Sequence, residues 1–153
     1  MRCRQIEERD FGAVASLLAN GFRTRDEKFW LEAFAQLRRH ATPEGLPKYG
    51  YLLESGNRAV GAVLMICSLV PAGDKDVRRC NLSSWYVDPA FRAYAPLLVS
   101  QALRHKDVTY VNVSSRRKAS RAIARASWWR CRYSAVGPAE RKSRCSTERA
   151  SRQ

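Results

Sequence analysis

The stretch SSWYVDP at residues 83–89 places hydroxyl groups at the point where an extended segment gives way to a turn. Side chains alternate between the two faces of a strand, so Ser84 and Tyr86 share one face while Ser83 and Trp85 share the other. Hydroxyl groups can relay protons, which makes Ser84 and Tyr86 weak candidates for acid–base chemistry. Packing on the sheet is the commoner role for an aromatic residue such as Tyr86.

Other residue types that carry chemistry are few and poorly spaced. The two histidines, His40 and His105, lie near the predicted C-terminal ends of helices. A histidine there is more plausibly a partner for the helix dipole than a metal ligand. The cysteines are odd in number and contain no CxxC pair, so we expect free thiols rather than a zinc site or a disulfide framework. They are Cys3, Cys67, Cys80, Cys131 and Cys145. The sequence predicts no metal.

The formal net charge of +14 invites a nucleic-acid interpretation, but its distribution argues against one. Residues 116–153 contain ten Arg, two Lys and two Glu, which is +10, so the first 115 residues carry only +4. The basic character therefore belongs to the C-terminal segment. We expect nucleic acid to bind, if at all, through non-specific contact with this tail.

The elements that must position these residues follow from apolar periodicity and turn residues. Strands are expected at residues 2–6, 49–54, 59–70, 80–87 and 108–113. Helices are expected at about residues 7–21, 26–39, 94–104 and 118–129. The sequence SGNR at 55–58 has hairpin chemistry, whereas PAGDKDVRR at 71–79 is predicted to be a loop. In the second helix the apolar positions are predicted to be core: Phe29, Trp30, Ala33, Phe34 and Leu37.

These elements predict an α/β fold with a mixed, mostly antiparallel central sheet flanked by helices. Short connections make the three central strands an antiparallel meander. The helix at 94–104 then gives a parallel crossover to the strand at 108–113. The N-terminus lacks the apolar core of a signal peptide, and the longest apolar run, 59–70, is too short to span a bilayer. We therefore expect a cytoplasmic protein that does not enter a membrane.

The order of elements, with VDPAFR (87–92) at a strand-to-helix junction, resembles the GCN5-related N-acetyltransferase (GNAT) superfamily over about residues 1–135. In that family the strand ends in V-D-P-x-[FYW]-R, and [QR]-x-x-G-x-[GA] leads into a helix. Here Arg92 fills the [QR] position, while Ala95 and Leu97 stand where glycine or alanine is usual, with Pro96 between them. Proline suits the first turn of a helix, where its missing N–H has no intrahelical partner anyway.

The resemblance implies an acyl-CoA co-substrate, acetyl-CoA or another thioester, and no metal. Amides at the helix start would hold its pyrophosphate, since unpaired N–H groups and the helix dipole together attract anions. In the family the backbone of the residue matching Val87 contacts the acyl carbonyl or the pantetheine arm. The implied binding residues are Val87, Arg92, Ala93, Tyr94, Ala95, Pro96 and Leu97. Asp88 is predicted to cap the turn before Pro89.

The chain also departs from the family pattern where catalysis is concerned. The strand CNLSSWYV (80–87) has no carboxylate to act as base, and the segment 126–133 lacks the usual helix tyrosine and Gly-Phe pair. Two interpretations of function follow. The first is an acyltransferase that acts on a small-molecule or protein amine. The second is a catalytically inactive member of the same fold that binds acyl-CoA or only a partner.

The sequence after about Ser115 is rich in Arg, Ser and Trp, and the closing β-hairpin of the family cannot be recognised in it. We predict an N-acetyltransferase-like domain at 1–135 and a basic, disordered tail at 136–153. Either the C-terminus is a genuine polyanion-binding tail, or it is translated out of frame. In the second case the C-terminal hairpin is incomplete and one sheet edge is exposed.

Overall fold

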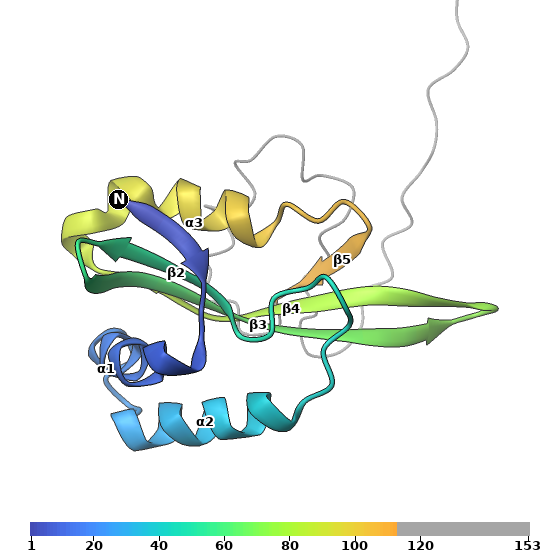
Figure 1. The fold of residues 1–153 in the computed structure, drawn as a ribbon, viewed down its shortest axis with the longest axis horizontal. Helices are drawn as coiled ribbons and strands as arrows, with labels where there is room; N and C mark the ends of the chain where they lie inside the picture. Colours follow the sequence, from blue (N-terminus) through green and yellow to red (C-terminus); the bar gives the residue numbers. More distant parts are fainter. Residues whose placement is uncertain (113–153) are drawn as a thin grey trace, which may run out of the picture.

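The computed structural model describes residues 1–112 of the 153-residue chain, and these residues form a sheet with helices on both faces (Figure 1). The strands are β1 (Arg2–Gln5), β2 (Gly50–Ser55), β3 (Arg58–Ala72), β4 (Lys75–Val87) and β5 (Val108–Val111). The α-helices are α1 (Phe11–Gly21), α2 (Glu27–Arg39) and α3 (Ala95–Ala102). Two short 3-10 helices, η1 (Glu8–Asp10) and η2 (Pro89–Tyr94), lead into α1 and α3. The predicted helix at 118–129, the closing hairpin and the tail at 136–153 lie outside the described residues.

The strand order in the sheet follows the order in the chain, from β1 to β5. Neighbours from β1 to β4 run antiparallel, and β5 pairs with β4 in parallel. This arrangement confirms the predicted meander and the parallel crossover through α3. The turn between β2 and β3 has the predicted hairpin chemistry, because Gly56 adopts a φ of +58° that side-chain-bearing residues avoid.

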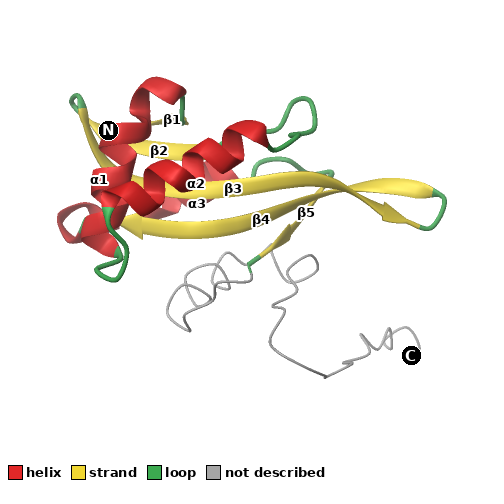
Figure 2. Cartoon of the chain, turned by 90° about the horizontal axis from the view of Figure 1, so that it is seen from below, coloured by secondary structure: helices red, strands yellow, loops and turns green. Residues whose placement is uncertain are grey.

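Two hydrophobic clusters hold the helices to opposite faces of the sheet (Figures 1 and 2). On one face α1 and α2 cover an aromatic-rich cluster in which Phe11 stacks on Phe34 with ring centroids 4.3 Å apart. On the other face α3 buries Leu98 and Ala102 against the central strands. The sheet is therefore buried on both sides, which matches the nearly continuous apolar run of β3.

The segment 71–79 is not a loop, and here the sequence-based prediction is wrong. It forms the ends of β3 and β4, which extend as a hairpin beyond the other strands (Figure 1) and close at a two-residue turn between Ala72 and Lys75. Gly73 in that turn has a φ of +66°. Both faces of this hairpin are largely exposed, so both can carry charged residues. Its sequence therefore lacks the apolar pattern by which a buried strand is recognised.

Charged side chains join the N-terminal strand to the rest of the domain. Arg4 donates two hydrogen bonds to the Asp10 carboxylate, at 2.6 and 2.8 Å, and two more to Glu54, at 3.2 and 3.4 Å. These side chains are only 10–17% exposed. The hydrogen bonds from Arg4 lower the pKa of Asp10 below its ordinary value. A planar guanidinium suits this double bidentate contact better than an ammonium group does.

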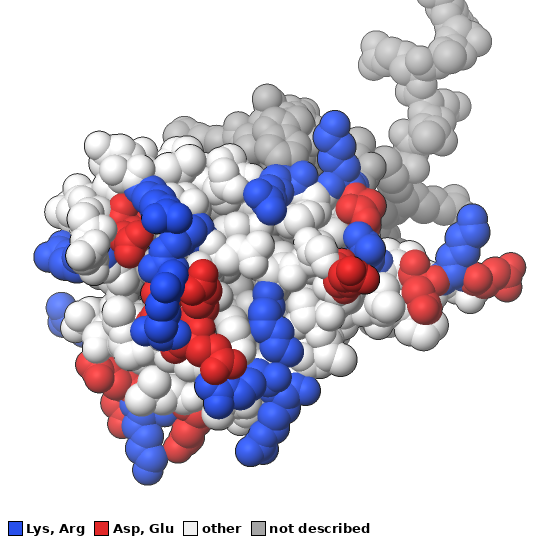
Figure 3. Space-filling model, in the orientation of Figure 1, with Lys and Arg blue, Asp and Glu red and all other residues white. Residues whose placement is uncertain are grey.

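On the face shown in Figure 3, Lys and Arg side chains are interspersed with Asp and Glu. Within residues 1–112, no helix is long and apolar enough to cross a bilayer.

Asp10→Asn should lower the free energy of unfolding by about 2–4 kcal/mol at pH 7, because it leaves the half-buried Arg4 short of a charged partner. The pKa of Asp10 is depressed in the folded state, so its contribution is complete above its ordinary pKa of 3.8 and is lost as the pH falls below that value. The difference between wild type and variant should therefore shrink in acid. Urea unfolding at several pH values measures this.

The matched control is Asp107→Asn, which breaks an exposed ion pair with Arg78 at 2.7 Å. Exposed pairs contribute about 0–1 kcal/mol, so this change should be small at every pH. Equal losses in the two variants would contradict the role assigned to Asp10.

Candidate functional site

The candidate site lies where β4 extends past the end of its parallel partner, β5. β5 pairs with β4 only from Arg78 to Asn81, whereas β4 continues to Val87. Among the described residues, no strand pairs with that edge of residues 82–87. Behind this opening, between β4 and α3, lies a narrow apolar cavity of about 20 Å³. Its lining includes Leu82, Trp85, Leu98, Leu103 and Asn112.

A β-bulge lies in the middle of this free stretch of β4. Val63 of β3 pairs with Trp85, and Met65 pairs with Leu82, so Ser83 and Ser84 together face the single residue Leu64. The extra residue shifts the alternation, so that Leu82 lies on the same face as Trp85, towards α3. The predicted separation of Trp85 and Tyr86 onto opposite faces is confirmed, but the bulge itself was not predicted.

The bulge places both serines at the larger cleft on the α2 side and Ser83 at the narrow cavity on the α3 side as well. Their hydroxyl oxygens are 3.5 Å apart. A hydroxyl pair at this place can donate to, or accept from, a ligand that reaches β4 from the α2 side.

Tyr86, the other candidate on this strand, packs against the C-terminal end of α1. Its ring centroid is 6.5 Å from that of Phe22, and a methyl group placed on Gly21 would come within 2.3 Å of the tyrosine ring. Gly21 is thus required for this close approach. Tyr86 has the sheet-packing environment that its residue type favours, and its candidacy for proton transfer stays a prediction.

The chain leaves β4 through a capped turn. The Asp88 carboxylate accepts a hydrogen bond from the Ala90 N–H at 3.0 Å, which confirms the predicted cap. The chain then forms η2 and passes directly into α3, with Pro96 in the first turn of the helix as predicted.

The predicted pyrophosphate-binding segment is the surface of this helix start. Arg92, Ala93, Tyr94, Pro96 and Leu97 are exposed, while Ala95 is half-buried. The Ala95 N–H donates to the Arg92 carbonyl, and Pro96 has no N–H. Fewer amides are therefore free for an anion than in a glycine-rich turn, and the role of these residues and of Val87 in binding stays a prediction.

A second cavity, the α2 cleft, lies on the opposite face of β4 from α3. It has a volume of about 340 Å³ and is open to solvent. The sheet side of the cleft consists of Leu64, Ile66, Ser83 and Ser84. The other side is formed by α2 and the residues that flank it, namely Arg25, Phe29, Trp30, Ala33, Gln36, Leu37 and His40.

The sequence did not predict the α2 cleft, because the apolar residues of α2 were all assigned to the core. Trp30, Phe34 and Leu37 are indeed buried, but Phe29 is 40% exposed and borders the cleft. A signal was available in the helical spacing, since Phe29, Ala33, Gln36 and His40 lie on one flank at intervals of three or four.

His40 closes one end of the α2 cleft. Its Nε2–H donates to the carbonyl oxygen of Cys67 on β3 at 2.8 Å, which fixes the ring and leaves Nδ1 as the nitrogen for another partner. The predicted place of His40 at the end of a helix is confirmed, since it caps the C-terminus of α2. Cys67 itself is buried opposite Cys80. Elsewhere in the sheet, partial burial raises the pKa of the Cys3 thiol to about 11. Residues 1–112 contain no cluster of three or more His, Cys, Asp or Glu that could hold a metal.

The arrangement of these elements matches that of solved acetyltransferases. Aminoglycoside 6'-N-acetyltransferase AAC(6')-Ig from Acinetobacter haemolyticus superimposes with a TM-score of 0.58 at 17% identity, covering 94% of this chain and 100% of that one. AAC(6')-Iy in complex with a CoA–acetylneamine bisubstrate analogue gives 0.63 at 14% identity, covering 94% and 98%. Naa50 from Arabidopsis thaliana, bound to a CoA–peptide bisubstrate analogue, gives 0.56 at 13% identity, covering 80% and 78%.

This chain has the GNAT acyltransferase fold. Structural likeness at such low identity establishes the fold and not the substrate. No protein-family model and no curated protein sequence matches the chain.

Gly21→Ala should destabilise the domain by about 1–3 kcal/mol, because the new methyl group overlaps the ring of Tyr86. The penalty should shrink when Tyr86→Leu is also present, since the two changes share one contact. Chemical unfolding of the two single variants and the double variant measures this coupling.

Gly12→Ala serves as the control on the same helix. A methyl group there meets nothing within 4 Å, so the variant should be stabilised by about 0.5–1 kcal/mol through helix propensity. If Gly21→Ala behaves like Gly12→Ala, the close packing of Tyr86 on α1 is wrong.

Proposed function

We propose that this protein transfers an acetyl group, or another acyl group, from acyl-CoA to an amine of a small-molecule or protein acceptor. The observation that carries the proposal is the free edge of β4 at residues 82–87, which ends in a capped turn and a helix start within a GNAT fold. Solved neighbours with this fold hold CoA-containing ligands.

The free edge of β4 suits the pantetheine arm of CoA. That arm contains two amide groups, and an unpaired strand edge offers N–H and C=O groups that can pair with them as another strand would. Val87 lies at the end of this edge, where the thioester would follow. Trp85 and the apolar cavity beside it supply walls that exclude water from the arm.

The helix start supplies the binding site for the pyrophosphate. Amides at the N-terminus of α3 and the positive end of its dipole favour an anion. Arg92, exposed on η2, adds a formal positive charge. This charge is more important here because neither Ala95 nor Pro96 offers a free amide N–H to the pyrophosphate.

The reaction requires the acceptor in the α2 cleft and the thioester at β4. The lone pair of the neutral amine attacks the thioester carbonyl carbon, the C–N bond forms and the C–S bond breaks. The amine proton leaves to a base or to water, and the CoA thiolate takes up a proton. Ser84 and Tyr86 remain the candidates for proton relay on β4. Orientation of the two substrates contributes much of the rate in such a transfer.

A second candidate function is binding of acyl-CoA without catalysis. It is favoured by the lack of a carboxylate in β4 from Cys80 to Val87 and among the residues of 1–112 that line the α2 cleft. An active enzyme with this lining would need water or a side chain other than a carboxylate as its base. The two functions differ in turnover and not in affinity for the co-substrate.

Acetyl-CoA should raise the midpoint of thermal unfolding of the full chain. A free acetyl-CoA concentration 100-fold above the dissociation constant adds about 2.7 kcal/mol to the free energy of unfolding. Release of free CoA thiol in the presence of a panel of primary amines then separates the two functions. Binding with turnover supports transfer, binding without turnover supports the second function, and no shift at millimolar acetyl-CoA contradicts both.

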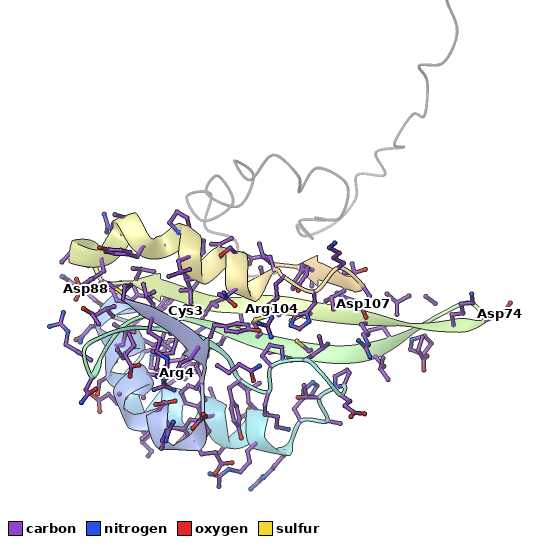
Figure 4. All side chains as sticks on the ribbon, turned by 45° about the horizontal axis from the view of Figure 1, so that its top comes forward. Cys3, Arg4, Asp74, Asp88, Arg104 and Asp107 are labelled. Carbon is purple, nitrogen blue, oxygen red and sulfur yellow. The ribbon has the colours of Figure 1, made fainter. Side chains whose placement is uncertain are left out.

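Arg92→Glu should weaken acetyl-CoA binding by about tenfold or more, because it places a carboxylate beside the phosphates. The control Lys75→Glu makes the same change in charge at the hairpin tip. That tip carries Asp74 and lies at the far end of the sheet from Asp88 (Figure 4). It should leave the affinity within about twofold, apart from a weak long-range effect that salt removes. Calorimetric titration measures both; equal weakening would mean that Arg92 acts only through net charge.

A further inference from the structure

The lining of the α2 cleft limits which amine it can accept. Its helical wall combines the cation Arg25 with the rings of Phe29 and Trp30, and its floor is the apolar surface of β3. Aspartate and glutamate are absent from the lining contributed by residues 1–112. A polycation finds no counter-charge on these walls, whereas an anion does.

Arg25 is held ready for a ligand by its aromatic neighbours. Its guanidinium carbon lies 4.4 Å from the ring centroid of Phe29 and 5.7 Å from that of Trp30. Within residues 1–112 it makes no ion pair. The contacts with the two rings restrain the guanidinium, whose N–H groups can pair with a planar anion such as a carboxylate.

The carboxylates nearest in sequence to Arg25 are already engaged. Asp26 caps α2 by accepting the N–H of Phe29 at 2.9 Å. Glu27 accepts a hydrogen bond from the hydroxyl of Ser16 at 2.6 Å. Neither lines the α2 cleft, and Glu32 on the next turn is exposed and does not line it either.

Trp30 forms part of the same wall of the α2 cleft. The residue lines the α2 cleft although it is only 2% exposed, and its Nε1–H has no hydrogen-bond partner within the described residues. This nitrogen is closed to solvent, so Trp30 contributes its ring, and not its N–H, to the wall of the α2 cleft. Arg25 thus offers charged donors on this wall, and residues 1–112 place no Asp or Glu in its lining.

We propose that the acceptor is a small primary amine that also carries a carboxylate, joined by an apolar or aromatic body. The carboxylate binds Arg25. The body lies against Phe29 and the sheet floor, and the amine faces the serine bulge on β4. This proposal rests on the proposed function and adds the acceptor class. It sets the chain apart from neighbours whose bisubstrate ligand contains an aminoglycoside.

The test uses three amines that share one body. They are 4-(aminomethyl)benzoate, 4-methylbenzylamine and 1,4-bis(aminomethyl)benzene, which present a carboxylate, a methyl group and a second ammonium at the same position. Acetyl transfer by the full chain should favour the carboxylate by about tenfold to hundredfold in kcat/KM, as expected for one charge-assisted contact. Equal rates, or preference for the diamine, would overturn the proposal.

Variants of Arg25 assign the preference to this wall. Arg25→Ala should remove most of the advantage of the carboxylate and leave the methyl compound within about twofold. Arg25→Glu should reverse the order in favour of the diamine. The control Arg23→Glu changes the same charge two residues away, on the neighbouring hollow rather than the α2 cleft, and should preserve the wild-type order.

Two readouts separate failure of this proposal from failure of the proposed function. Acetyl-CoA should stabilise the Arg25 variants as much as wild type. If it does and the three amines react alike, the acceptor class is wrong and the function stands. If no amine is acetylated, calorimetry with 4-(aminomethyl)benzoate still decides. Binding that Arg25→Ala weakens supports the acceptor class, and no Arg25-dependent binding overturns it.

Discussion

The early end of the β4–β5 pairing is the constraint on which the rest of the site depends. A parallel neighbour satisfies the backbone of β4 only as far as Asn81, and the six residues that follow have one edge without a strand partner in the described chain. Backbone groups buried without partners are costly, so this edge favours a ligand that can supply them. The bulge at Ser83 and Ser84 lies in the same stretch and turns hydroxyl groups towards the other face.

Packing on both faces holds this stretch in place. The apolar residues of α3 pack against one face of the sheet, and those of α1 and α2 pack against the other. Tyr86, immediately after Trp85, is wedged against Gly21 at the end of α1. A rigid scaffold around a strand with a free edge is the arrangement that a two-substrate transfer needs, because neither substrate then has to pay for ordering the protein.

The sequence predicts the topology well because the topology depends on local signals. A glycine in the turn at 55–58 and the proline at the start of α3 mark the connections, and the segment 88–107 is long enough for a parallel crossover. The site is predicted less well. The residue types of Ser83 and Ser84 do not indicate a bulge. The flank of α2 that contains Phe29 has the same apolar character as the buried flank beside it. Charge in the hairpin at 71–79 conceals strands that are exposed on both faces.

The extension of β3 past its partner β2 has a consequence for self-association. β2 covers the outer edge of β3 only as far as Leu64, so the edge from 66 to 72 has no strand beside it in the described chain. A two-residue turn makes Ala72 and Lys75 a hydrogen-bonded pair, and alternation then makes Pro71 and Asp76 a pair whose backbone nitrogens point outward. The imino nitrogen of Pro71 carries no hydrogen, so this outward position lacks the donor that a docking strand would require. Pro71 thus makes this exposed edge a poorer partner for a strand of a neighbouring molecule.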